Sequence, residues 1–140
     1  MAVTKERLSM IVFSGEMDKL LPVGILASGA VAMGHEVRVF LTFWGLMAFK
    51  KDAFFQMPVS PAFAPMVGDL AGTLKERKIP STVEQLRTAK ELGDVEVVAC
   101  GMTMDLFELK LEDLEDIVDR VAGVGEFIET AKEGHTTLFI

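Results

Sequence analysis

Short apolar runs alternate with longer helical patterns in the first part of the chain. Residues 8–13 (LSMIVF) form a mostly apolar run, as expected of a strand that is covered on both faces. Residues 16–34 are rich in small and apolar side chains and predict a helix that holds Pro22 in or near its first turn. Residues 36–42 (EVRVFLT) predict a second strand. Strand, helix and strand in this space indicate a βαβ unit with parallel pairing.

The same alternation returns after residue 80. Ser81 and Glu84 have the spacing of a capping box and open a predicted helix that runs to Gly93. Residues 95–99 predict a third strand, and a short helix is expected over residues 103–107. Two further predicted elements close the chain, an amphipathic helix that ends near Gly134 and a strand over residues 136–140.

Residues 43–80 show the weakest pattern. Pro58, Pro61 and Pro65 interrupt this stretch, and methionine and phenylalanine residues are scattered through it. We predict one helix around residues 66–78, preceded by a long loop of the kind that covers active sites. Packing of the same apolar residues on a neighbouring subunit is an equally good interpretation. The sequence leaves open whether the segment is a lid or a subunit interface.

Alternating strands and helices over 140 residues predict one α/β domain that spans the whole chain, residues 1–140. Its sheet is expected to be open and mostly parallel, with helices on both faces. In such sheets, ligands bind at the carboxyl ends of the strands. Those ends are therefore where we look for chemistry.

Five residues are expected to meet at that edge. Ser14 and Gly15 end the first predicted strand, Phe43 and Trp44 follow the second, and Cys100 ends the third. Ser14 and Gly15 have the position to bind an anion at the start of the following helix, and the two aromatic rings have the position to wall a pocket. This convergence predicts a site that no single residue would predict.

Cys100 is the only cysteine of the chain and lies where a strand ends and a short helix is expected to begin. Unpaired N–H groups and the helix dipole favour the thiolate at such a position. Gly101 allows close approach of a substrate, and the Thr103 hydroxyl is suited to bind a thiolate or persulfide, or to cap the helix. Asp105 is expected in the first helical turn, where it would satisfy N–H groups. A buried, inert thiol is the competing interpretation.

The rest of the sequence limits the chemistry that Cys100 can perform. His35 and His135 are expected at the opposite end of the sheet, so no general base stands beside the thiol. A single cysteine excludes a peroxidase cycle through an intrachain disulfide and offers no zinc site. The acidic run of residues 112–119 is interpreted as a solvated face, and we expect no metal or cofactor. Exchange of a sulfur atom between thiols needs neither an acid nor a base.

Composition adds expectations about partners and location. A formal charge of −7 and a pI near 4.8 exclude nucleic acid as a partner, because phosphate binding requires a basic face. The mean hydropathy of +0.35 is high for a monomer and predicts a homo-oligomer. The longest apolar stretch, residues 20–33, is too short to cross a bilayer. A lone thiol and an N-terminus without a signal-peptide pattern indicate the cytoplasm.

Four stretches resemble the DsrE/DsrF-like family of sulfur-relay proteins, in the branch often labelled peroxiredoxin-like. They cover most of the chain: residues 18–46, residues 90–93, residues 99–107 (ACGMTMDLF) and residues 121–140. The resemblance implies a flavodoxin-like fold of about five mostly parallel strands, a homo-oligomer, and a cysteine that carries sulfur as a persulfide or thiosulfonate.

Within this resemblance, only Cys100 takes the sulfur-carrying role, and residues 101–105 complete its motif. Two departures stand out. Thr103 replaces the usual serine, and Phe107 and Glu108 replace the usual Met-Gly that follows the motif. The second departure is expected to alter access to the site and its fit to partners.

We therefore predict a sulfur carrier or sulfurtransferase, with Cys100 as the nucleophile and Gly101, Thr103, Ser14, Gly15 and Trp44 as the residues that bind substrate. Its partners would be sulfur-donor and sulfur-acceptor proteins or small thiols. The alternative is a non-catalytic oligomeric module that binds a small anion and keeps a structural cysteine. A redox sensor that forms a Cys100 disulfide between subunits is a third hypothesis.

Overall fold

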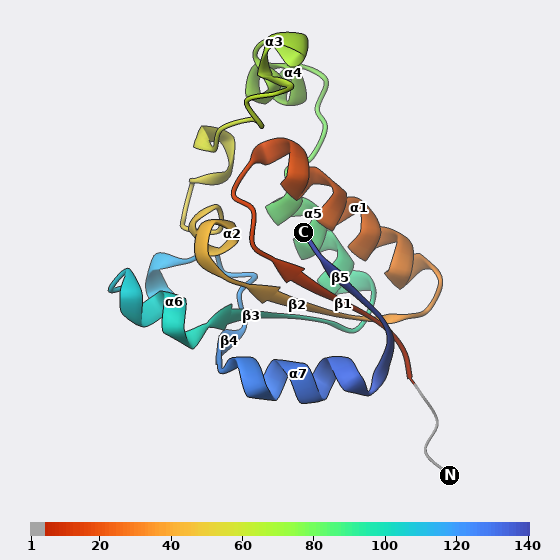
Figure 1. The fold of residues 1–140 in the computed structure, drawn as a ribbon. Helices are drawn as coiled ribbons and strands as arrows, with labels where there is room; N and C mark the ends of the chain where they lie inside the picture. Colours follow the sequence, from red (N-terminus) through yellow and green to blue (C-terminus); the bar gives the residue numbers. More distant parts are fainter. Residues whose placement is uncertain (1–4) are drawn as a thin grey trace.

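A computed structural model describes residues 5–140, and five parallel strands form a single sheet at its centre (Figure 1). The strand order is β4-β3-β2-β1-β5. The strands are β1 (Lys5–Val12), β2 (Glu36–Leu41), β3 (Val95–Cys100), β4 (Arg120–Ala122) and β5 (Gly134–Phe139). The predicted α/β class with an open, parallel sheet is confirmed. The sequence patterns missed β4, because three residues are too few to show a period.

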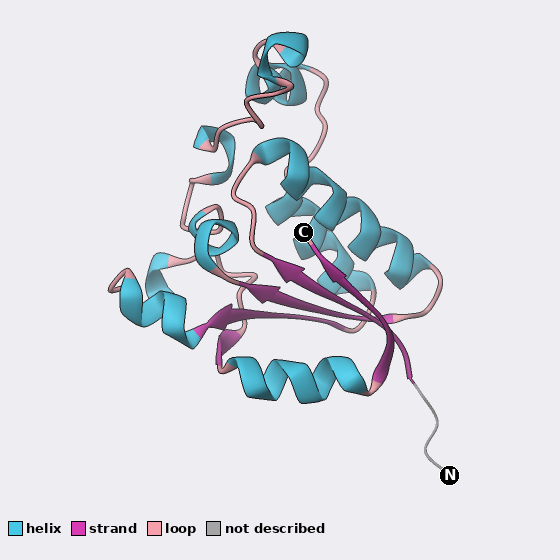
Figure 2. Cartoon of the chain, in the orientation of Figure 1, coloured by secondary structure: helices cyan, strands magenta, loops and turns pink. Residues whose placement is uncertain are grey.

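Helices cover both faces of the sheet (Figure 2). On one face, α1 (Met17–Ala32) packs beside α5 (Thr82–Leu92), and on the other lies α7 (Val124–Lys132). Strand side chains alternate between the two layers. Val97 and Ala99 join the main core under α1 and α5, whereas Val98 and Cys100 pack with Phe127 of α7. The thiol therefore belongs to the smaller core, on the α7 face.

Two of the predicted helices have the expected bounds with small shifts. The α1 helix begins at Met17, so Pro22 lies in its second turn rather than its first. The capping box at the start of α5 is confirmed in part, because the Ser81 hydroxyl accepts the Glu84 N–H at 3.2 Å. The acidic run exposes most of its carboxylates, while Leu114, Ile117 and Val118 lie in the core.

Residues 43–80 are more structured than the sequence suggested. They form α2 (Phe43–Met47), the 3₁₀ turn η1 (Phe54–Gln56), α3 (Ala64–Val67) and α4 (Leu70–Glu76). The single helix predicted over residues 66–78 is wrong, because Gly68 has a φ of 56° and divides it. Figure 1 shows α3 and α4 projecting beyond the sheet and its helices.

The short helix after Cys100, α6 (Gly101–Leu106), begins two residues earlier than predicted. Asp105 therefore lies in its second turn, and the predicted capping role of Asp105 is wrong. Cys100 itself occupies the N-cap position. No helix within residues 5–140 has both the length and the apolar character that crossing a bilayer requires.

Candidate functional site

Cys100 lies at the junction between β3 and α6, with 8% of its surface exposed. The strand pairing gives it defined neighbours. Cys100 is paired with Ala122 of β4 on one side. On the other side Leu41 pairs with Ala99, so the next residue, Thr42, stands beside Cys100. The thiol is thus held between two strands at the carboxyl edge of the sheet.

Two threonine hydroxyls meet beside this thiol. Thr103 is fully buried, and its Oγ1 lies 3.3 Å from Oγ1 of Thr42. The backbone N–H of Phe43 donates to Thr103 Oγ1 at 3.1 Å. Because this bond uses a lone pair of Thr103, the hydroxyl keeps its own proton to donate. The arrangement therefore offers hydrogen-bond donors to a negatively charged sulfur.

Phe43, whose N–H donates to Thr103, has a strained backbone conformation. Phe43 has a φ of 47°, in the left-handed region that aromatic residues rarely adopt. Such a conformation costs about 1–2 kcal/mol and persists only where surrounding contacts maintain it. Here it directs the Phe43 N–H at Thr103, and the start of α2 is tied to the thiol site by that bond.

Opposing effects set the pKa of the Cys100 thiol. Burial raises it, whereas hydrogen bonds from the Thr103 hydroxyl and N–H, the Thr42 hydroxyl and the Met102 N–H lower it. The hydrogen bonds prevail, so the pKa lies below the ordinary value of a thiol. The thiolate is the nucleophilic form, and this site favours it.

We expect the native thiol to ionise at a lower pH than the thiol of the urea-unfolded chain. Since the folded pKa is lowered, ionisation of Cys100 stabilises the fold above the unfolded pKa, and this contribution is lost as the pH falls through the folded pKa. The measurement is the rate of alkylation by iodoacetamide across pH, with midpoints compared between native and unfolded protein. A native midpoint at or above the unfolded one would contradict the expectation.

Ser14, Gly15 and Trp44 line a neighbouring pocket of about 400 Å³ rather than the thiol site itself. Phe13 and Met57 supply apolar walls, and the other lining residues are Glu16, Lys19 and Pro58. Gly15 is required there, because a Cβ would lie 2.6 Å from the Trp44 carbonyl oxygen. The residues predicted to form one site are therefore divided between this pocket and the surroundings of Cys100.

Several polar groups in this pocket are engaged with one another. Lys19 Nζ binds the Glu16 carboxylate at 3.0 Å, and the Glu16 N–H donates to Ser14 Oγ at 3.1 Å. Hydrogen bonds from Ser60 and Lys19 lower the pKa of the Glu16 carboxyl. A pocket with mainly apolar walls and an internally paired lysine suits an uncharged ligand better than an anion.

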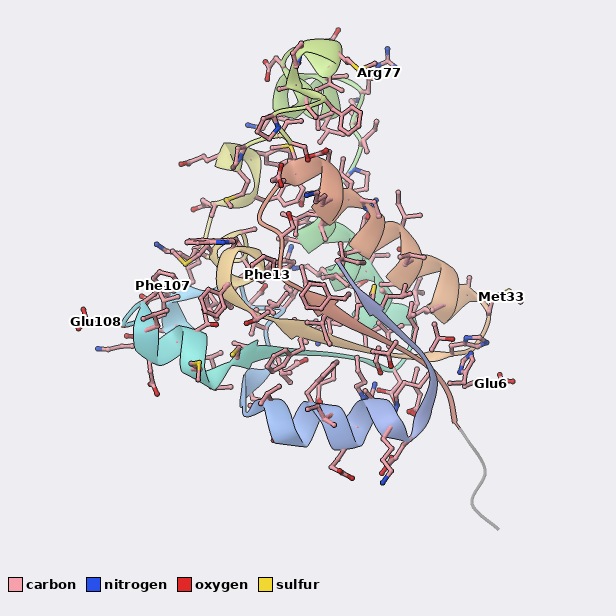
Figure 3. The ribbon with its side chains drawn as sticks, in the orientation of Figure 1. Glu6, Phe13, Met33, Arg77, Phe107 and Glu108 are labelled. Atoms are coloured by element: carbon pink, nitrogen blue, oxygen red, sulfur yellow. The ribbon has the colours of Figure 1, made fainter. Side chains whose placement is uncertain are left out.

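Aromatic rings join the two sites along the edge of the sheet. Phe13 lies between Phe139 and Phe43, with ring centroids 5.9 and 6.1 Å away, and Phe107 contacts Phe43 and Trp44 at 6.4 and 5.9 Å. We call these five residues the aromatic ridge. Figure 3 shows Phe13 and Phe107 at the same end of the sheet.

The sequence as a whole matches the model of the DsrE/DsrF/DrsH-like family, over residues 4–69 and 56–139. The chain belongs to this family. It is 33% identical to the uncharacterized protein YrkE of Bacillus subtilis, over 96% of this chain and 97% of YrkE. It is 32% identical to the sulfur carrier protein DsrE2 of Allochromatium vinosum, over 97% of this chain and 99% of that protein.

A solved structure supports the fold of this family member. The protein of unknown function MTH1491 from Methanobacterium thermoautotrophicum superposes with a TM-score of 0.62 over 97% of this chain and the whole of that chain. The two sequences are 16% identical, so the likeness concerns the fold alone.

The departure from the family motif after α6 also has a structural counterpart. Phe107 belongs to the aromatic ridge, and its ring lies beside Trp44. Glu108 has a φ of 53°, a conformation that favours glycine, the residue that the family resemblance leads us to expect there.

The sequence analysis missed Thr42, and it placed Phe43 at this edge for its aromatic ring rather than for its backbone N–H. The pairing of residues 36–42 with residues 95–99 would have indicated Thr42, had the register been known. Gly101 and Thr103 lie beside Cys100, as their adjacency in sequence requires. His35 and His135 face each other at 5.2 Å at the opposite end of the sheet, as predicted.

Proposed function

We propose that this protein is a sulfur carrier that holds a sulfane sulfur atom on Cys100 and passes it to a partner thiol. The observation that carries the proposal is a single thiol with several hydrogen-bond donors around it. Within residues 5–140, none of these partners is a general base. Such a site suits an anionic sulfur and a simple exchange reaction. Membership of the DsrE/DsrF/DrsH-like family and the relative named a sulfur carrier support a role in sulfur relay.

Transfer proceeds in two balanced steps. The Cys100 thiolate attacks the outer sulfur of a donor persulfide, R–S–SH, so that a new S–S bond forms on Cys100 and the donor S–S bond breaks. The products are Cys100–S–SH and the donor thiolate R–S⁻. An acceptor thiolate then attacks the outer sulfur of Cys100–S–SH, takes it, and restores the Cys100 thiolate. No external oxidant or reductant is consumed.

The test is intact-mass analysis of the wild-type protein before and after incubation with inorganic polysulfide. We expect one added sulfur atom per chain, which is lost again when a small thiol such as glutathione is added. A wild-type protein that gains no sulfur, or that cannot release it to the added thiol, would contradict a carrier role. We place the protein in the cytoplasm as part of this proposal, because reducing conditions there keep a lone thiol free of disulfides.

A second candidate function, a small-molecule binding module, is favoured by the pocket of Ser14, Gly15 and Trp44. In that case Cys100 is a structural residue of the smaller core. Alkylation of the native protein separates the two functions. A thiol that stays inert to iodoacetamide at every pH up to unfolding supports the binding module, and a reactive thiol with a lowered midpoint supports the carrier.

We expect copies of this chain to associate through the aromatic ridge. Phe139, Trp44 and Phe13 expose 69%, 51% and 40% of their surfaces, and contiguous apolar surface of this kind is rare on monomers. Size-exclusion chromatography with light scattering is expected to give a mass above that of one chain. Phe139→Asp should shift it toward one chain, because association would bury an unpaired charge.

The matched control for this experiment is Met33→Asp. Met33 is 74% exposed and lies at the opposite end of the sheet, so this variant adds the same charge away from the ridge (Figure 3). Equal masses for the wild type and Phe139→Asp would count against association through the ridge.

A further inference from the structure

Thr42 stands next to Cys100, although the two residues are far apart in sequence. The pairing of Leu41 with Ala99 puts Thr42 and Cys100 in adjacent positions of neighbouring strands, so their side chains leave the same face of the sheet. The Thr42 N–H donates to the Val12 carbonyl at 3.0 Å, which extends the sheet by one residue beyond β2. The hydroxyl therefore has a fixed place beside the thiol.

The two hydroxyls differ in how they are held. Thr103 Oγ1 is anchored by the Phe43 N–H, whereas the 3.3 Å between Thr42 Oγ1 and Thr103 Oγ1 is long for a bond between hydroxyls, whose usual distance is about 2.7–2.8 Å. Within the described part of the chain, the Cys100 thiolate is the one other hydrogen-bond partner of the Thr42 hydroxyl. Its proton is therefore directed at whichever sulfur atom of Cys100 carries the negative charge.

The two threonines also lie at different depths. Thr103 is completely buried, whereas Thr42 is partly exposed. A sulfur atom added to Cys100 extends about 2 Å beyond Sγ, the length of an S–S bond. Because Thr103 is completely buried and Thr42 reaches the surface, Thr42 is the hydroxyl beside which an outward-pointing sulfur atom would lie.

We propose that Thr42 is a positioning residue for the carried sulfur: its hydroxyl donates to the outer sulfur of Cys100–S–S⁻, while Thr103 serves Sγ. The inference rests on the proposed function. The outer sulfur carries the negative charge once the hydropersulfide has lost its proton to solvent, so a donor at this point stabilises the loaded form. Thr42 would thereby stabilise the anion of the loaded carrier more than it stabilises the empty thiolate.

The test compares Thr42→Val and Thr103→Val, each in the empty and the loaded state. Valine has nearly the shape of threonine but no hydroxyl, so the packing is kept, although Thr103→Val also removes the acceptor of the Phe43 N–H. Circular dichroism and urea denaturation confirm that each variant is folded. The protein is loaded with inorganic polysulfide, freed of excess reagent and alkylated with iodoacetamide across pH, and intact mass distinguishes the two products. At pH values below the alkylation midpoints, loss of one hydrogen bond from a threonine hydroxyl to sulfur should slow alkylation about three- to tenfold.

Which of the two variants is alkylated more slowly should differ between the empty and the loaded state. Thr103→Val should slow the empty thiol more than Thr42→Val does, and Thr42→Val should slow the loaded form more than Thr103→Val does. Thr42→Ser, which keeps the hydroxyl, should restore the wild-type rate. The same rank in both states, or a loaded Thr42→Val that matches the wild type, would overturn the role of Thr42 alone. A wild type that never loads would instead overturn sulfur carriage itself, and this inference with it.

Discussion

Cys100→Ser is expected to abolish sulfur uptake, with a fall of at least about 100-fold in the sulfur gained from inorganic polysulfide. A serine hydroxyl does not ionise near neutral pH and is a far weaker nucleophile toward sulfur than a thiolate. The substitution is small, and Thr42 and Thr103 remain to bind the new hydroxyl, so the fold should persist. Intact-mass analysis measures the uptake, and circular dichroism confirms that the protein is folded.

A matched control separates the thiol from its surroundings. In the double variant Met33→Cys with Cys100→Ser, the chain again carries one cysteine, now at an exposed position at the far end of the sheet. No threonine pair lowers the pKa of that thiol, so at neutral pH it should load more slowly than the wild type. Equal loading of this control and the wild type would mean that the Cys100 site contributes nothing beyond a thiol.

Gly45→Ala is expected to cause a large loss of stability. A Cβ at Gly45 would lie 2.2 Å from the Val12 carbonyl oxygen and 2.8 Å from its carbonyl carbon. These are backbone atoms of β1, which cannot move without disturbing the sheet. The Gly45 N–H also donates to the Phe13 carbonyl at 2.8 Å. We expect a loss of about 3 kcal/mol in the free energy of unfolding, measured by urea denaturation.

Gly45→Ala should also raise the pKa of the Cys100 thiol. Displacement of α2 moves the Phe43 N–H away from Thr103, so the alkylation midpoint of Cys100 should rise toward that of an ordinary thiol. The control is Gly29→Ala in α1, where a Cβ meets no atom within 4 Å. That change should stabilise the helix by about 0.5–1 kcal/mol. A Gly45→Ala protein as stable as the wild type would refute the close packing of α2 on β1.

Cys100→Ser and Gly45→Ala test two ends of one chain of contacts in the molecule. The end of β1 holds α2 through Gly45, α2 presents the Phe43 N–H to Thr103, and Thr103 stands beside Cys100. The thiol is therefore tuned by a segment that begins more than fifty residues before it. This link explains why a strained Phe43 is retained at the start of α2.

Apart from β4, the strands and the longer helices could be predicted because each has a local cause. The apolar run of β1 and the small-residue pattern of α1 are readable over a single window of sequence. The break at Gly68 was not foreseen, since a glycine inside a helical pattern is tolerated as often as it ends a helix. The first turn of α6 was placed too late, because Cys100 itself takes the capping position.

By itself, the sequence determined the α/β class, the position of Cys100 at a strand end, and the neighbours that adjacency guarantees, Gly101 and Thr103. Those properties follow from hydrophobic period and chain connectivity, which are local. Only the tertiary structure decided that Thr42 lies beside the thiol and that Ser14 and Trp44 line a separate pocket. The physical reason is that strand register and the path of α2 depend on contacts between distant segments, such as Gly45 on Val12, which no local window contains.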